Sequence, residues 1–257
     1  MMRAVRPFIL IAAVRRTGST MLAEALSELP KAFVFREPKL FRGRVSLKEG
    51  DLAMLPCAID VVPEDREVSP ALDAALRFRE TVVRPLSRSV EQIGIKEIRY
   101  GPRWPEVLDV LGEVAPVKVV ALGRDPRDQF LSLAYRARTR RVPLRGTFGP
   151  AAIAEDIERE FVRQRELIAA TGALTVRYED LCRDPAVLER IRRFVDSPVG
   201  AGSIGAFETD EHVLHDGRVS ELRVNRWERE PDAGLLSQAA EVMRRLGSYC
   251  RYWGYDG

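Results

Sequence analysis

The sequence has few of the residues from which metal centres and disulfide frameworks are built. Its 257 residues include three cysteines and two histidines. Cys57, Cys182 and Cys250 are widely spaced and odd in number, which argues against a disulfide framework and favours a reducing, cytoplasmic setting. His212 and His215 lie three residues apart, but no third ligand accompanies them, so we expect no metal site.

Long apolar runs are missing as well. No stretch approaches the roughly 20 apolar residues that a membrane-spanning helix needs. The apolar run near the N-terminus is short and lacks a small-residue cleavage site, so it does not predict a signal peptide. A hydrophobic content of 46% is sufficient for one sizeable core. We therefore expect a protein without a membrane span, folded as a single domain over residues 1–257.

Lysine is scarce, because arginine makes up most of the 41 basic residues. Arginine is the better fork for phosphate and sulfate, although codon usage in a GC-rich genome explains most of the bias. The basic segment with Arg138, Arg140, Arg141 and Arg145 has no interleaved aromatic residues, and the net charge is only +3. We therefore predict a solvated flank or a contact to an anionic ligand there, and no nucleic-acid partner.

Apolar runs alternate with amphipathic segments along the chain. The predicted strands are 7–14, 32–35, 93–98, 117–122 and 173–177. The predicted helices are 20–29, 70–92, 104–113, 126–139, 151–171, 185–196 and 232–247. This alternation predicts an α/β fold with one doubly wound parallel sheet of about five strands, and a ligand at the carboxyl ends of the strands. Long irregular segments lie near 40–70, 138–150 and 197–230, and segments of this kind in a compact domain are often functional lids that cover a ligand.

The most informative segment follows the first predicted strand and leads into the first predicted helix. Its residues combine one glycine with hydroxyls and guanidinium groups: Arg15, Arg16, Thr17, Gly18, Ser19, Thr20 and Met21. A strand-to-helix turn of this composition predicts a phosphate site, because the first N–H groups of a helix are unpaired and carry partial positive charge. The alternative is an ordinary turn in which Thr or Ser caps the helix.

Two common nucleotide motifs do not fit this segment. A Walker loop needs a second glycine followed by lysine, and a dinucleotide fingerprint needs three glycines. The segment has one glycine and no lysine. A kinase or GTPase is therefore disfavoured, and a kinase with a degenerate loop remains only as an alternative.

A second segment has a similar arrangement. Arg124 follows the strand predicted over 117–122, Asp125 and Pro126 are a good N-cap and first helical residue, and Ser132 lies about two turns into the helix. Arg124 and Ser132 can therefore meet one phosphate above the edge of the sheet.

Together the two segments resemble the sulfotransferases that use 3′-phosphoadenosine 5′-phosphosulfate (PAPS), in particular the bacterial and carbohydrate-type branch. Residues 16–22 match the 5′-phosphosulfate loop R-[ST]-G-[ST]-[ST]-x-L, and Arg124 to Ser132 match the spacing of the 3′-phosphate motif. The resemblance extends from Phe8 to about Trp227. It implies a P-loop-kinase-like sulfotransferase fold, PAPS as donor with PAP as product, no metal, and transfer to a hydroxyl of a sugar, glycolipid or small metabolite. A catalytically inactive PAP-binding regulator is the alternative outside enzymes.

The resemblance also implies catalytic roles for three residues. Arg16 corresponds to the basic residue beside the bridging oxygen. Glu37 precedes a proline after the second strand, where a carbohydrate sulfotransferase has its proposed base; this role needs a pKa raised by burial. The alternative is a surface Glu37 paired with Arg36. Lys96 matches the lysine of a Lys-x-His strand, although Ile98 stands at the histidine position, and its alternative is a lysine in a salt bridge.

The same resemblance implies roles for several further residues. Arg226 is predicted to cover the adenine and the 3′-phosphate, and Trp227 is equally compatible with packing. Residues 178–185 match a strand-end segment of the family and are interpreted as a structural junction. If Glu37 is not the base, the next candidates are Glu97, Asp60 and His215, although strand alternation points Glu97 away from Lys96.

Overall fold

The computed structural model describes residues 6–57, 59, 69–139, 149–200 and 224–255. In these residues five strands form one sheet: β1 (Phe8–Ala13), β2 (Ala32–Arg36), β3 (Gln92–Glu97), β4 (Val117–Gly123) and β5 (Leu174–Arg177). The strand order is β2-β3-β1-β4-β5, and all neighbouring pairs are parallel. The predicted fold class is confirmed, and each of the five predicted strands is present.

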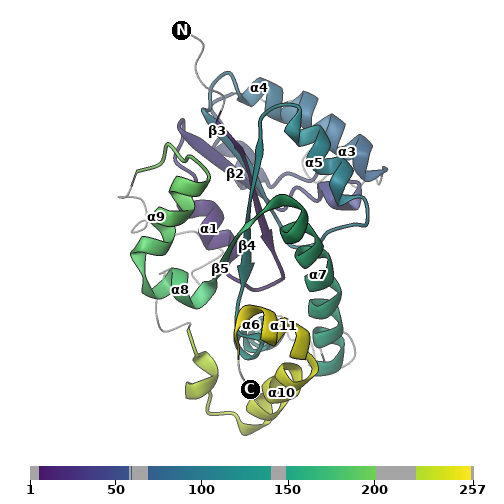
Figure 1. The fold of residues 1–257 in the computed structure, drawn as a ribbon, viewed down its shortest axis with the longest axis vertical. Helices are drawn as coiled ribbons and strands as arrows, with labels where there is room; N and C mark the ends of the chain where they lie inside the picture. The colour runs from purple at the N-terminus through teal and green to yellow at the C-terminus, as the bar shows by residue number, and fades with distance from the viewer. Residues whose placement is uncertain (1–5, 58, 60–68, 140–148, 201–223, 256–257) are drawn as a thin grey trace.

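Helices cover both faces of the sheet (Figure 1). They are α1 (Ser19–Ala25), α2 (Glu49–Ala53), α3 (Ala71–Phe78), α4 (Arg84–Leu86), α5 (Trp104–Gly112), α6 (Pro126–Thr139), α7 (Pro150–Thr171), α8 (Tyr178–Arg183), α9 (Pro185–Phe194), α10 (Ala233–Arg245) and α11 (Gly247–Trp253). The other helical segments of the described residues are the 3-10 helices η1 (Leu40–Arg42) and η7 (Arg226–Arg229) and the π-helix η2 (Arg79–Val83), which joins α3 to α4.

The helices differ from the prediction in three ways. The helix predicted over 20–29 ends at Ala25. The helix predicted over 70–92 ends at Leu86, and its last predicted residue, Gln92, instead pairs with Ala32 in the sheet. Helices α2, α8 and α11 were not predicted, and α2 and η7 lie in segments that were expected to be irregular.

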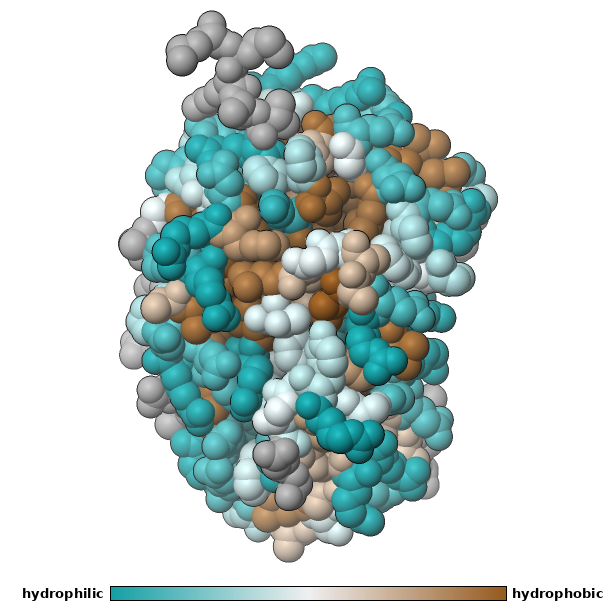
Figure 2. Space-filling view, in the orientation of Figure 1, coloured by the Kyte–Doolittle hydropathy of each residue, from teal (hydrophilic) through white to brown (hydrophobic). Residues whose placement is uncertain are grey.

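The core has two layers because β1 is the central strand and is buried on both sides. Ile9 and Ile11 pack with α1 and α9, while Phe8 and Leu10 pack with the helices of the other face. Gly94 in β3 lets the two strands lie close together, since a Cβ there would be 2.7 Å from the Cβ of Ile9. Seen from the side of Figure 1, the apolar surface gathers around the middle of the molecule and is framed by hydrophilic residues (Figure 2).

Buried polar side chains tie together the carboxyl ends of the central strands. The amide of Gln164 on α7 donates to the carbonyl of Ala12 at 2.9 Å and to that of Leu122 at 3.1 Å. The hydroxyl of Tyr100 lies 2.7 Å from the carbonyl oxygen of Glu97 and 3.1 Å from that of Ala13. These contacts fix the edge from which the predicted ligand-binding segments depart. None of the helices in the described residues is both long and apolar enough to cross a bilayer.

Candidate active site

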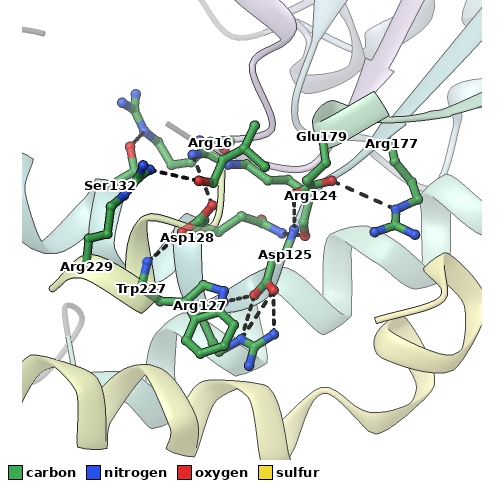
Figure 3. A network of polar contacts seen from close by, with 12 residues as sticks. Arg16, Arg124, Asp125, Arg127, Asp128, Ser132, Arg177, Glu179, Trp227 and Arg229 are labelled. Atoms are coloured by element: carbon green, nitrogen blue, oxygen red, sulfur yellow. Dashed lines mark hydrogen bonds and ion pairs between the residues drawn. The ribbon is translucent and has the colours of Figure 1, made fainter. Parts of the chain in front are cut away.

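The two segments predicted to hold phosphate meet above the ends of β1 and β4. The Nε of Arg16 donates a hydrogen bond to the Oγ of Ser132 at 2.8 Å, and the Nη1 of Arg124 donates to the carbonyl of Arg16 at 3.2 Å (Figure 3). The meeting follows from the sheet, because β1 and β4 are adjacent and parallel. Two segments far apart in the sequence thus form one polar network.

The loop between β1 and α1 has a conformation that depends on its glycine. Gly18 is the N-cap of α1 with φ 78°, and a Cβ there would lie 2.3 Å from two ring atoms of Tyr178. The hydroxyl of Thr17 donates to the carbonyl of Val14 at 2.9 Å and is fully buried. The proposed Thr or Ser cap is therefore wrong, since no side chain caps α1. In this conformation the hydroxyl hydrogen of Thr17 is used within the loop itself.

The other members of the loop have different surroundings. Ser19 is buried, whereas Thr20 and Met21 are half-buried on the first turn of α1. Arg15 leaves the loop in another direction and makes an ion pair with Asp156 of α7 at 2.8 Å. Of the two loop arginines, it is therefore Arg16 that the structure brings to Arg124 and Ser132.

Arg124 is held on several sides. Its guanidinium lies 4.3 Å from the ring centroid of Tyr178 and 3.6 Å from the carboxylate of Asp128, and only 7% of the residue is exposed. Burial raises the pKa of Asp128 to about 6, with a contribution from the charge of Asp125, although Arg124 opposes the shift. Above this pH Asp128 is the negative partner of Arg124. The backbone N–H of Trp227 donates to the same carboxyl group at 3.2 Å.

The C-terminal helix braces the turn that carries Arg124. The hydroxyl of Tyr249 accepts from the N–H of Arg124 at 2.9 Å and lies 3.0 Å from its carbonyl oxygen. Tyr255 donates to Glu179 at 2.7 Å, and the other oxygen of Glu179 accepts from the N–H of Asp125 at 3.0 Å. The two tyrosines were missed because nothing in the sequence links residues so far apart. Glu179 belongs to the segment that was interpreted as a structural junction, and it has that role.

The two remaining catalytic candidates form one pair. Lys96 of β3 makes a short ion pair with Glu37, and the N–H of Glu37 donates to the carbonyl of Lys96 at 2.8 Å. Lys96 is 2% exposed, whereas 32% of the Glu37 side chain is exposed. Arg36 instead donates to Asp51 at 2.8 Å, so the alternative pairing of Glu37 with Arg36 is wrong. The salt bridge that was the alternative role for Lys96 is present, and its partner is Glu37, the other catalytic candidate.

The electrostatics of this pair differ from the expectation. Burial alone would raise the pKa of Glu37, but the charge and hydrogen bond of Lys96, aided by Lys48 and Lys39, leave it below its ordinary value. Burial lowers the pKa of Lys96, and Glu37 opposes that shift. The expectation that burial would raise the pKa of Glu37 is therefore wrong for the paired state. Glu37 is a carboxylate across the neutral range.

Glu97 has no access to a substrate. It is 2% exposed and accepts a hydrogen bond from the N–H of Leu40 at 3.1 Å, which fastens the segment after Glu37 to β3. Burial, followed by the negative charge of Glu37, raises the pKa of Glu97 to about 8. The alternation argument holds, because Glu97 and Lys96 take opposite faces of the strand.

We predict that Glu97→Gln stabilises the protein at alkaline pH. Since the folded-state pKa is raised, the contribution of Glu97 is fully present below its unfolded value of 4.5 and is lost as the pH rises toward 8. The loss approaches about 1.4 kcal/mol per pH unit within that window. Urea unfolding at pH 5 and pH 8.5 should therefore show an advantage of the variant only at the higher pH. The exposed Glu166→Gln is the control, and an equal effect at both pH values would contradict the prediction.

Residues near the C-terminus complete the described part of the site. Arg226 lies 3.8 Å from the ring centroid of Tyr135 on α6, and Trp227 stacks with the guanidinium of Arg127 at 3.6 Å. Trp227 thus packs, while Arg226 lies against the helix that carries Ser132. Several candidates fall outside the described residues: Asp60, Arg140, Arg141, Arg145, His212 and His215.

Comparison with solved structures shows where this fold occurs. The chain aligns over 99% of its length with 99% of the sulfotransferase domain from the curacin biosynthetic pathway, at TM-score 0.58 and 14% identity. It aligns with the sulfotransferase domain of the Synechococcus PCC 7002 olefin synthase over 100% of this chain and 97% of that one, at TM-score 0.54 and 19% identity. A sulfotransferase from Alicyclobacillus acidocaldarius matches over 96% of both chains, at TM-score 0.51 and 16% identity.

These likenesses establish a sulfotransferase-like fold over the length of the chain. No protein-family model and no curated protein sequence matches it.

Proposed function

We propose that this protein transfers a sulfuryl group from PAPS to a hydroxyl of a sugar, glycolipid or other small metabolite. The observation that carries the proposal is the meeting of Arg16, Arg124 and Ser132 at the carboxyl edge of the sheet. A parallel α/β sheet binds its ligands at this edge, and arginine forks suit phosphate.

The residues present fit a donor with two separate phosphate groups. Arg124 and Ser132 would hold the 3′-phosphate, because Ser132 accepts from Arg16 and keeps its own hydroxyl hydrogen for a ligand. The loop around Gly18 would hold the 5′-phosphosulfate, with its backbone N–H groups and Arg16 as donors. When bound, PAPS supplies an activated sulfuryl group, and PAP is the leaving group.

Glu37 and Lys96 are proposed to handle the acceptor. Glu37 is the exposed member of the pair, so it can take the proton of the acceptor hydroxyl, while the buried Lys96 fixes its orientation and ionisation. The reaction balances as acceptor hydroxyl plus PAPS giving sulfate ester, PAP and one proton, which Glu37 receives. The proton affinity of Glu37 rises if the ammonium of Lys96 turns away from it, toward the negative charge that develops on the reacting groups.

We predict that Arg124→Ala weakens PAP binding far more than binding of adenosine 5′-phosphosulfate. Only PAP carries the 3′-phosphate, and a charge-assisted fork to it contributes about 1.5–3 kcal/mol, or roughly ten- to hundred-fold in affinity. Calorimetric titration of both nucleotides checks the prediction. Arg165→Ala, an exposed arginine on α7, is the control for loss of charge. Equal losses for the two nucleotides would reject this role for Arg124.

A thermal-shift comparison separates the proposal from the kinase alternative. Stabilisation by PAP and not by ATP with Mg²⁺ supports a sulfotransferase. Stabilisation by ATP with Mg²⁺ alone supports a kinase and overturns the proposal. Labelled PAPS, incubated with the protein and a cell extract and followed by mass spectrometry, distinguishes an active enzyme from an inactive PAP-binding regulator.

A further inference from the structure

Three arginines gather around one carboxylate beside the donor loop. Asp156 of α7 accepts from Arg159 in a short ion pair and pairs with Arg15 at 2.8 Å, while Arg99 lies 3.9 Å away. Within the described residues Arg99 makes no hydrogen bond, and this long ion pair is its polar contact. The donor groups of the cluster therefore outnumber the acceptor oxygens that Asp156 can offer.

Neighbouring acidic groups do not remove this excess of positive charge. Glu160 is 3.9 Å from both Arg159 and Arg163, but its carboxylate already accepts the N–H of Tyr100 at 3.1 Å. Arg163 itself donates to the carbonyl of Tyr100 at 2.6 Å. Burial lowers the pKa of Arg15, and the charges of Arg99 and Arg159 lower it further, whereas Asp156 and Glu160 oppose the shift without reversing it.

The cluster lies at the same sheet edge as the candidate active site. Ala12 of β1 pairs with Glu97 of β3, so Arg15 and Arg99 emerge from neighbouring strands shortly after the sheet ends. Arg16, which contacts Ser132, is the next residue along the chain from Arg15.

A purely structural role explains only part of this arrangement. The pair of Arg15 with Asp156 suffices to fasten the loop to α7. It does not require Arg99 or Arg159, whose side chains remain 36% and 54% exposed. Partly exposed guanidinium groups that a buried carboxylate holds together are preorganised to bind an anion. Folding has already brought their like charges together, so binding need not do so.

We propose that Arg99 and Arg159, gathered by Asp156 and Arg15, form a subsite for an anionic group of the acceptor. The group is a sulfate, phosphate or carboxylate, so the acceptor is itself anionic. This inference rests on the proposed sulfuryl transfer for the identity of the occupant, but the anion subsite can be tested separately.

The first arm of the test measures the subsite with inorganic sulfate as the probe. The protein is saturated with PAP and titrated with sodium sulfate against sodium chloride at matched ionic strength, with thermal unfolding as the readout. Arg99→Ala and Arg159→Ala should each lower the sulfate affinity by about tenfold or more, and Arg165→Ala should leave it unchanged. Equal sulfate affinity in wild type and Arg99→Ala overturns the subsite. If PAP does not bind, the same titration of the ligand-free protein still decides the subsite, and the proposed function fails alone.

The second arm identifies the occupant through the charge of the product. Wild-type protein is incubated with ³⁵S-labelled PAPS and the small-molecule fraction of a cell extract, and the labelled product is separated by anion exchange. A neutral acceptor gives a singly charged sulfate ester, whereas an anionic acceptor gives a product with at least two negative charges. Multiply charged product, reduced in Arg99→Ala, supports the proposal. A singly charged product overturns the proposal that the acceptor is anionic. The subsite would then bind free inorganic anions only.

Discussion

Glu37→Gln is expected to collapse sulfuryl transfer while PAP binding persists. The amide keeps the shape of the side chain but cannot accept the proton of the acceptor hydroxyl, and loss of a general base costs roughly 10²–10⁴-fold in rate. Lys96 would still find an oxygen at this position, so the end of β3 should keep its structure. Initial rates with labelled PAPS, together with PAP affinity by calorimetry, check both halves of the expectation. Near-wild-type transfer by Glu37→Gln would reject Glu37 as the base.

The pH dependence adds a second readout for the same residue. Because Lys96 holds the pKa of Glu37 below 4.5, the rate should be insensitive to this ionisation between pH 6 and 8 and should fall only in strong acid. Lys96→Met removes the charge that lowers the pKa, so its acid limb should move to higher pH. In the double variant with Glu37→Gln that limb should vanish, and the two effects should not add, since the residues form one pair. The exposed Glu166→Gln should keep the wild-type profile.

The sequence was sufficient for the sheet and for the residues at its carboxyl edge. Apolar runs such as that of β1 marked strands because the sheet is parallel and covered on both faces. Once the strands were parallel, Arg16 and Arg124 had to end at the same edge, and the structure brings them together.

What the sequence could not predict depends on contacts between distant residues. Glu37 and Lys96 were chosen separately, each with its own alternative, and only the pairing of β2 with β3 reveals that they are partners. The shift of the Glu37 pKa was predicted with the wrong sign, because burial, which raises it, is outweighed by the contact with Lys96 together with the charges of Lys48 and Lys39. The bracing of Arg124 by Tyr249 likewise joins residues 125 positions apart.

The sequence also did not predict that the side chains of the adjacent residues Arg15 and Arg16 have different partners. Both were assigned to the donor from the composition of the turn, and Arg16 also from the resemblance. The left-handed backbone of Arg16, with φ 65°, helps to send the two side chains to different partners, Arg15 to Asp156 and Arg16 to Ser132. Such a turn in a non-glycine residue is sparsely populated and cannot be read from composition.

Arg16→Ala is expected to lower kcat by about two orders of magnitude or more, while PAP affinity changes less. In the transition state, negative charge builds on the oxygen that bridges the sulfuryl group and the departing phosphate, and an interaction made mainly there acts on turnover more than on binding. Rates with saturating PAPS and calorimetric titration of PAP provide the two numbers. Arg16→Lys keeps the charge and should recover part of the turnover.

The contact of Arg16 with Ser132 suggests a different role for Arg16, in donor binding, and this role predicts a different result. If Arg16 serves the 3′-phosphate through Ser132, then Arg16→Ala should weaken PAP binding as strongly as Arg124→Ala does, and a raised KM with nearly normal kcat should follow. A double-mutant cycle with Ser132→Ala measures the connection, because residues that hold one group show coupled losses in PAP affinity. Strong coupling in affinity, with turnover preserved, would reassign Arg16 from the transition state to donor binding. Weak coupling with collapsed kcat would place its contribution at the bridging oxygen.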